Sequence, residues 1–182
     1  MKKSKMRCFG SGDELYERYH DEEWGVPLEL SDDERELFER LALEGFQSGL
    51  SWITVLRKRP AFREAFDDFE PAVIAAYGED DVERLMQDAS IIRNRQKIDA
   101  TIRNARALTA LHDDGRSLAD IVEAHAPQSH ARPATVHEQN GRSEESTALA
   151  KELKSLGFTF VGPVTMYALM QAVGVIDDHA ED

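Results

Sequence analysis

The sequence lacks a second cysteine, a long apolar run and an excess of basic residues. Cys8 is the single cysteine in a chain of 182 residues, which excludes an intramolecular disulfide and favours a reducing, cytoplasmic setting. No stretch approaches the ~18 consecutive apolar residues that a membrane-spanning helix requires. The charged segment Met1–Lys5 is not followed by an apolar region, so we expect neither a signal peptide nor a membrane partner.

Basic residues are scarce relative to acidic ones. The chain has 22 Lys and Arg against 35 Asp and Glu, a formal net charge of −13 at pH 7. Such a chain is not expected to bind nucleic acids in general, because phosphate contacts require local positive charge. Residues 91–106 are an exception, because they hold five basic residues and one acidic residue. This segment is either a solvated helix face that balances acidic neighbours or a surface for an anionic partner.

Apolar residues recur at helical spacing along most of the chain, and no convincing strand alternation occurs. Because 41% of the residues are hydrophobic, we expect a single all-α domain over residues 1–182. The polar stretch from His125 to Arg142 predicts a long surface loop. Caps, prolines and glycines predict the helices as follows: one from Ser31 with a capping box to Glu34, one over 52–56, one after Pro60, one from Pro71, one over 82–86, one over 95–112, and others from Ser117, from Ser143 to Gly157 and from Pro163 to Val173.

Glu44 is unusual because it shares a helix face with leucines. Leu37, Leu41 and Glu44 recur at the spacing that places side chains on one face. A carboxyl group on a buried face must be paired, hydrogen-bonded or protonated. The alternative is a glutamate at the end of the helix whose side chain turns out to water.

Four aromatic residues lie near Glu44 in the sequence: Tyr16, Tyr19, Trp24 and Trp52. Each of them taken alone is an ordinary core residue. Together with a buried carboxyl group they form a second hypothesis, a pocket for a flat ring that carries N–H groups or a positive charge.

Two more groups of residues suggest binding chemistry. Cys8, His20 and His179 have side chains that bind zinc, although residues so widely spaced are usually unrelated. Around residues 88–98 a short helix ends, a tight turn follows and a long helix begins, and a turn before a helix N-terminus can offer backbone N–H groups to a phosphate.

Four sequence motifs resemble the DNA-3-methyladenine glycosylase I family of the helix-hairpin-helix superfamily. They are Tyr19–Pro27, Leu43–Leu56, Phe158–Pro163 and Gln171–His179, and the resemblance covers roughly Cys8 to His179. It implies an all-α helix-hairpin-helix fold and an enzyme of base excision repair, which flips 3-methyladenine out of double-stranded DNA and hydrolyses its N-glycosidic bond. A non-catalytic helical module that binds a modified base or damaged DNA is the alternative function.

The resemblance also implies roles for individual residues. Glu44 matches the glutamate that recognises and helps to release the base, Tyr19 and Trp52 match the aromatics that stack on it, and Leu50 matches the wedge that fills the gap in the duplex. The DNA-binding hairpin corresponds to residues 88–98, with contacts from Ile92, Arg93, Asn94, Arg95 and Lys97. The family's catalytic apparatus lacks the aspartate that related glycosylases place after the hairpin, so Asp99 receives no such role.

The same resemblance implies a structural zinc that joins the two ends of the chain through Cys8, His20 and His179. The family's fourth ligand, a cysteine four residues after the histidine, falls after Asp182, so Glu181, Asp182, the terminal carboxylate or water are the alternatives. Phe9 and Gly10 follow Cys8 where the family often has a tryptophan, so one wall of the pocket is expected to differ. We further expect a monomer.

Overall fold

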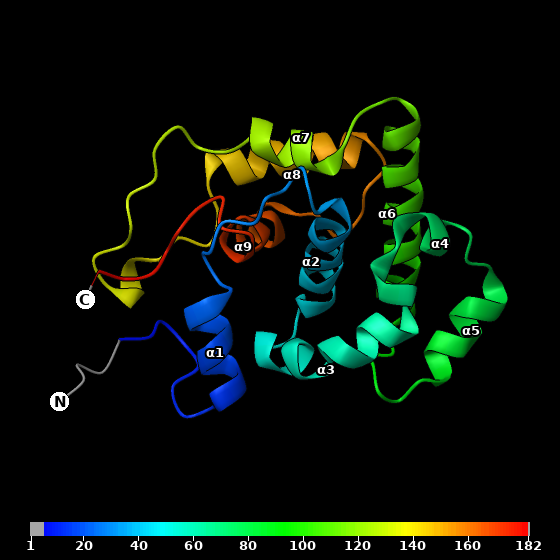
Figure 1. Ribbon diagram of the computed structural model, residues 1–182, viewed down its shortest axis with the longest axis horizontal. Helices are drawn as coiled ribbons and strands as arrows, with labels where there is room; N and C mark the ends of the chain where they lie inside the picture. Colours follow the sequence, from blue (N-terminus) through cyan, green and yellow to red (C-terminus); the bar gives the residue numbers. More distant parts are fainter. Residues whose placement is uncertain (1–5, 182) are drawn as a thin grey trace.

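Helices and connecting turns make up residues 6–181, the part of the chain that the computed structural model describes, and this part contains no strand (Figure 1). The expectations placed on Met1–Lys5 and on Asp182 lie outside the described residues. No described helix is long and apolar enough to cross a membrane. The elements are α1 (Glu14–Glu22), α2 (Glu34–Gln47), α3 (Trp52–Ala65), a 3-10 turn (Asp67–Phe69), α4 (Pro71–Ala75), α5 (Glu79–Gln87), α6 (Arg95–Asp113), α7 (Leu118–Ala124), a second 3-10 turn (Val136–Glu138), α8 (Glu144–Ser155) and α9 (Pro163–Ala172).

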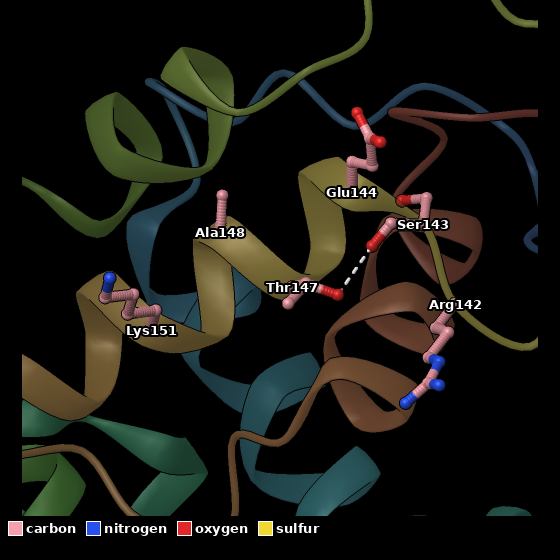
Figure 2. A pocket seen from close by; sticks show the side chains of 6 residues that line it. All are labelled: Arg142, Ser143, Glu144, Thr147, Ala148 and Lys151. Atoms are coloured by element: carbon pink, nitrogen blue, oxygen red, sulfur yellow. Dashed lines mark hydrogen bonds between the residues drawn. The ribbon is translucent and has the colours of Figure 1, made fainter.

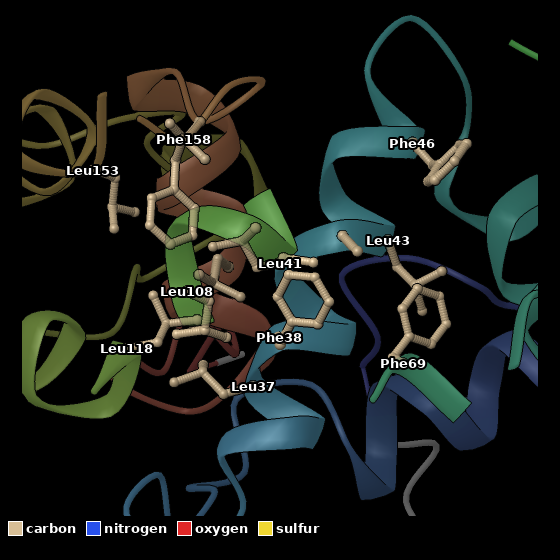
Figure 3. Packing of buried hydrophobic residues seen from close by; sticks show 14 of the residues in the cluster. Leu37, Phe38, Leu41, Leu43, Phe46, Phe69, Leu108, Leu118, Leu153 and Phe158 are labelled. Atoms are coloured by element: carbon tan, nitrogen blue, oxygen red, sulfur yellow. The ribbon is translucent and has the colours of Figure 1, made fainter. Parts of the chain in front are cut away.

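The central element is α2, which contacts α3, α6, α7 and α9 (Figure 1). Every residue from Leu37 to Phe46 is buried, because neighbouring helices cover this part of α2 on several sides. Figure 3 shows Phe38 of α2 among Leu108 of α6, Leu118 of α7 and Phe158, all within one hydrophobic cluster. A carboxyl group on such a helix has little access to water.

Several predicted helix boundaries are confirmed. The long helix begins at Arg95, Pro71 and Pro163 open α4 and α9, and the Ser117 and Ser143 hydroxyl groups accept backbone N–H groups as N-caps. Gly157 follows α8 with a φ of +95°, a conformation that favours glycine.

Two expectations about the first half of the chain were wrong, and one helix was missed. Ser31 does not begin α2, because the Asp33 side chain accepts the Glu36 N–H and the helix starts at Glu34. The segments on either side of Pro60 form one helix, α3, rather than two, and Pro60 lies inside it on the exposed surface. Helix α1 was not predicted, although Asp13 caps it by accepting the Tyr16 N–H.

Two of the sequence motifs meet in space next to α9. The Gly25 N–H donates to the Gln171 carbonyl at 2.8 Å, and the Leu28 N–H donates to the Val173 carbonyl at 2.9 Å. Gly174 has a φ of +73°, and a Cβ atom there would lie 2.3 Å from the Pro27 nitrogen. Only glycine allows this close approach, which holds residues 25–28 against residues 171–174.

The stretch from His125 to Arg142 forms the expected surface loop, apart from the 3-10 turn over Val136–Glu138. It packs on the C-terminal segment, because the Glu181 N–H donates to the Pro133 carbonyl and the Gln139 amide donates to the Asp178 carbonyl. The Cys8 sulfur lies 3.8 Å from the same Asp178 carbonyl, so the first and last described segments are neighbours.

Candidate functional site

The Glu44 side chain is buried, with 5% of its surface exposed. No hydrogen bond from residues 6–181 stabilises its ionised form. Burial raises the pKa of Glu44 to about 8, and the positive charge of Arg40, one helical turn earlier, opposes this rise. The hypothesis of a buried carboxyl group is therefore confirmed, and the alternative of a side chain turned out to water is wrong.

A cavity of about 130 Å³ adjoins this carboxyl group. For comparison, an engineered apolar cavity of roughly 150 Å³ holds a benzene molecule, so the space suits a small flat ring. Its lining comes from the N-terminal segment and from α1, α2, α3 and α9, and consists of Phe9, Tyr16, Tyr19, Trp24, Glu44, Gln47, Trp52, Ala168 and Gln171.

Aromatic rings form most of the walls of this cavity. The centroids of Tyr19 and Trp52 are 5.4 Å apart with their planes tilted by 46°, and those of Phe9 and Tyr16 are 4.7 Å apart. Burial, followed by the charge of Glu44, raises the pKa of Tyr16 and of Tyr19, so both phenols keep their protons at neutral pH. The Trp52 indole N–H is buried without a hydrogen-bond partner among the described residues. Electron-rich faces beside a carboxyl group suit a ring that is cationic and bears N–H groups.

Four lining residues were missed as site residues by sequence reasoning: Phe9, Gln47, Ala168 and Gln171. Gln47 lies three residues after Glu44, a spacing that shares a helix face and could have identified it. Gln171 comes from α9 and donates a hydrogen bond to the buried Asp178 at 2.8 Å, which only the tertiary structure reveals. Phe9 lines the pocket, and it forms the wall that was expected to differ from the family.

Leu50 lies beside this pocket in the turn that joins α2 to α3. Gly49 adopts a φ of +79°, and the Leu50 N–H donates to the Gln47 carbonyl at 2.7 Å. The Gln47 side chain in turn donates to the Leu50 carbonyl at 2.8 Å. This fixed turn leaves 39% of the Leu50 surface exposed, as an apolar wedge requires.

The segment expected to bind DNA forms a turn between α5 and α6. The Asn94 side chain caps α6 by accepting the Lys97 N–H at 3.1 Å, and Ile92 is half-buried. Arg93 is exposed, and Arg95 is also exposed but pairs with Glu79. The contacts of Ile92, Arg93, Asn94 and Arg95 with DNA stay a prediction.

Lys97 differs from the other residues of the expected DNA contact. Only 8% of its surface is exposed, and its ammonium group donates to the backbone carbonyls of Phe46 and Ser48. A side chain held in this way is not presented to a phosphate. The predicted direct contact of Lys97 with DNA is therefore corrected, because basic character in the sequence does not reveal which way the side chain points.

The three residues expected to bind zinc lie close together. The His20 and His179 ring centroids are 4.6 Å apart, and the Cys8 N–H donates to the His20 Nε2 atom at 3.2 Å. His179 pairs through Nδ1 with Asp177 and through Nε2 with the His20 carbonyl. Their ring nitrogens are thus engaged with protein groups, and no described group of three or more His, Cys, Asp or Glu side chains is arranged to hold a metal ion. The chemistry of the donors suits zinc, and in this structure hydrogen bonds to protein groups engage the ring nitrogens that would bind the ion.

A wider hollow of about 720 Å³ lies at the start of α8 (Figure 2). Its lining has neither an aromatic ring nor a buried carboxyl group, and consists of Arg142, Ser143, Glu144, Thr147, Ala148 and Lys151. The Ser143 carbonyl accepts a hydrogen bond from the Thr147 hydroxyl, an ordinary contact within the first turn of a helix. The chemistry expected for the site lies in the aromatic pocket instead.

Comparisons with known proteins agree with this geometry. Residues 9–182 match the family model described as methyladenine glycosylase. The chain is 48% identical over 177 residues to DNA-3-methyladenine glycosylase 1 of Escherichia coli (strain K12), which covers 95% of this chain and 92% of that protein. It is 42% identical over 180 residues to DNA-3-methyladenine glycosylase of Haemophilus influenzae, which covers 97% of this chain and 95% of the relative.

Solved structures give the same result. A crystal structure of 3-methyladenine DNA glycosylase I superposes with a TM-score of 0.91 at 47% identity, covering 97% of both chains. A structure of the Staphylococcus aureus protein, described as showing the basis of 3-methyladenine recognition, superposes with a TM-score of 0.89 at 34% identity and covers 96% of this chain and 93% of that one. The all-α fold implied by the resemblance is therefore confirmed.

Proposed function

The chain belongs to the methyladenine glycosylase family, and on this premise we propose that it excises 3-methyladenine from alkylated DNA by hydrolysing the N-glycosidic bond, the first step of base excision repair. The buried Glu44 carboxyl group in an aromatic pocket is the single observation that carries the proposal. The pocket offers both properties that a cationic flat base needs, electron-rich faces and an acceptor for N–H groups.

A base inside a duplex cannot enter this cavity, so the nucleotide is first extruded from the base stack. Methylation at N3 gives the adenine a positive charge, which weakens its glycosidic bond because the base departs as a neutral species. Stacking against the faces of Tyr19 and Trp52 favours the cationic base over normal adenine by roughly 0.5–2 kcal/mol. Water adds to the sugar carbon, the bonding electrons leave with the base, and the proton of the water passes to solvent.

Glu44 acts as the residue that recognises the base and supplies negative charge. Because its pKa is about 8, the carboxyl group is mostly protonated at pH 7 in the protein alone. A cation that enters the pocket favours the ionised form, so the carboxyl group loses its proton as the base binds. The resulting carboxylate accepts the base N–H groups. Asp99 is not part of this step, because it lies within α6 near Arg95.

The duplex binds on the surface of the turn before α6. Ile92, Arg93, Asn94 and Arg95 contact its backbone, while Leu50 fills the gap that the extruded nucleotide leaves. Few basic side chains are free for this task, so binding to undamaged DNA is weak and decreases strongly with salt. We further propose that the protein acts as a monomer on double-stranded DNA in the cytoplasm.

Zinc stays a separate proposal. Cys8, His20 and His179 would hold the ion, with the fourth ligand open, and it would fix the two ends of the chain to each other. The donors have suitable chemistry and proximity, but their present hydrogen bonds do not match a metal site. No step of the reaction involves the ion.

The proposed function is tested by incubating the protein with methylated duplex DNA and measuring the released 3-methyladenine. Glu44→Gln keeps the size of the side chain and removes its charge, so we expect at least a tenfold lower rate. Binding of damaged DNA without release of any base would favour the alternative, a non-catalytic binding module. Near-normal rates for Glu44→Gln would refute the role of Glu44.

A further inference from the structure

Lys97 is a buried cation that the excision step does not use. It lies in the first turn of α6, directly after the turn that is proposed to bind DNA. Its ammonium group donates to the Phe46 carbonyl at 2.8 Å and to the Ser48 carbonyl at 2.5 Å. A long flexible side chain loses much of its conformational freedom in such a position, so the contact is a defined part of the structure.

Both acceptors lie at the C-terminal end of α2. The last carbonyl groups of a helix have no partner within the helix and carry partial negative charge. Helix α2 has no basic residue in its own last turn. Lys97 therefore supplies from α6 the cation that stabilises this helix end.

The anchored carbonyls lie between the two parts of the site. Glu44 comes two residues before Phe46, and Leu50 comes two residues after Ser48. The Lys97 backbone N–H is itself bound by the Asn94 side chain in the DNA-binding turn. One residue thus joins that turn to the segment that carries both the base-recognising carboxyl group and the wedge.

We propose that Lys97 is a positioning residue, which holds Glu44 and Leu50 at a fixed place relative to the bound duplex. This role rests on the proposed excision of a flipped base. When a nucleotide leaves the duplex, its base must enter the pocket of Glu44 while Leu50 fills the gap, so both residues must be held in place at the same time. This positioning role replaces the contact between Lys97 and a DNA phosphate that the sequence predicted. Misplacement by about 1 Å can reduce a rate by about 10²-fold, so a loosened anchor affects the reaction more than the binding of DNA.

The test compares Lys97→Met, which removes the ammonium group, with Arg93→Met, which removes an exposed basic side chain of the same turn. For each we would measure the single-turnover rate of base release at saturating protein and the dependence of DNA affinity on salt. Lys97→Met should lower the rate by about tenfold and leave the salt slope unchanged. Arg93→Met, which removes a proposed phosphate contact, should reduce the salt slope of DNA affinity by about one.

Lys97→Arg keeps a cation and should restore part of the rate of base release. If Lys97 only stabilised the fold, Lys97→Met would lower the melting temperature and leave the saturated rate unchanged. A reduced salt slope in Lys97→Met, or a normal saturated rate, would overturn the proposal. Where Lys97→Met does not fold, Lys97→Gln is measured in the same way. If the native protein released no base, the proposed function would fail, and hydrogen exchange over residues 46–51 in Lys97→Met would still decide whether Lys97 anchors the segment.

Discussion

Arg40 lies one turn before Glu44 on α2, but its guanidinium group does not neutralise the Glu44 carboxyl group. Arg40 donates to Glu36 at 3.0 Å and to the Ala172 carbonyl at 3.2 Å, and it lies 3.4 Å from Glu23. Its charge is thus shared with other acceptors. Burial therefore outweighs the attraction of Arg40 and raises the pKa of Glu44 to about 8.

This relationship predicts the pH dependence of the reaction. The anionic form of Glu44 attracts the cationic base, and in the free protein its population grows as the pH rises through about 8. We expect kcat/KM for excision to increase with pH up to that value, because this ratio reports the ionisation of the free enzyme. The rise should be absent in Glu44→Gln, and an equal rise in that variant would assign the pH dependence to another group.

The same pKa predicts how pH changes stability. The unfolded chain ionises this carboxyl group near its ordinary pKa of 4.5, whereas the folded protein keeps it protonated until about 8. Between these two pH values the folded state binds one proton that the unfolded state has lost. The free energy of unfolding therefore decreases as the pH rises through this window, by on the order of a few kcal/mol in total. Glu44→Gln should gain stability relative to the native protein from about pH 5 to 8 in urea unfolding experiments. A constant difference across this range would contradict the shifted pKa.

Sequence periodicity accounts for much of the fold and for the burial of Glu44. Its failures have local causes. Ser31 and Asp33 are both capping residues, and only the tertiary position of α2 decides between them. Pro60 usually ends a helix, yet the buried residues on both sides keep α3 continuous. Lys97 shows the same limit for the site, because its inward direction depends on carbonyls from another helix.

The aromatic walls make a prediction about selectivity. Trp52→Leu keeps an apolar side chain but removes the ring that lies next to Tyr19. Loss of ~0.5–2 kcal/mol of cation–π attraction should lower the affinity for methylated duplex by roughly 2- to 30-fold. Affinity for unmodified duplex is the control and should not change, since normal adenine carries no charge. An equal loss for both duplexes would show that Trp52 contributes only general packing.

Leu50 predicts a difference between duplex and single-stranded substrates. Its side chain is 39% exposed, so Leu50→Ala should change the stability of the protein by less than about 0.5 kcal/mol. Single-turnover excision from methylated duplex should fall by about tenfold, because a smaller side chain no longer fills the gap left by the base. Excision from methylated single strands should stay unchanged. Val73→Ala, an exposed apolar residue on α4, is the matched control.

The final prediction concerns the metal. Cys8 and His179 come from opposite ends of the chain, and an ion bound by them together with His20 would join these ends. Elemental analysis of protein purified without a chelator should give about one zinc per chain. Cys8→Ser should lower that content, and EDTA should lower the melting temperature, because binding of the ion contributes to folding.

Removal of zinc should also disturb one wall of the pocket. Phe9 follows Cys8 directly, and Trp24 lies 4.9 Å from the His179 ring, centroid to centroid. Both line the cavity, so loss of the ion should weaken base binding as well as stability, and tryptophan fluorescence should report the change. Protein without zinc that melts at the same temperature in EDTA would instead show that the existing hydrogen bonds among Cys8, His20 and His179 suffice to hold the ends together.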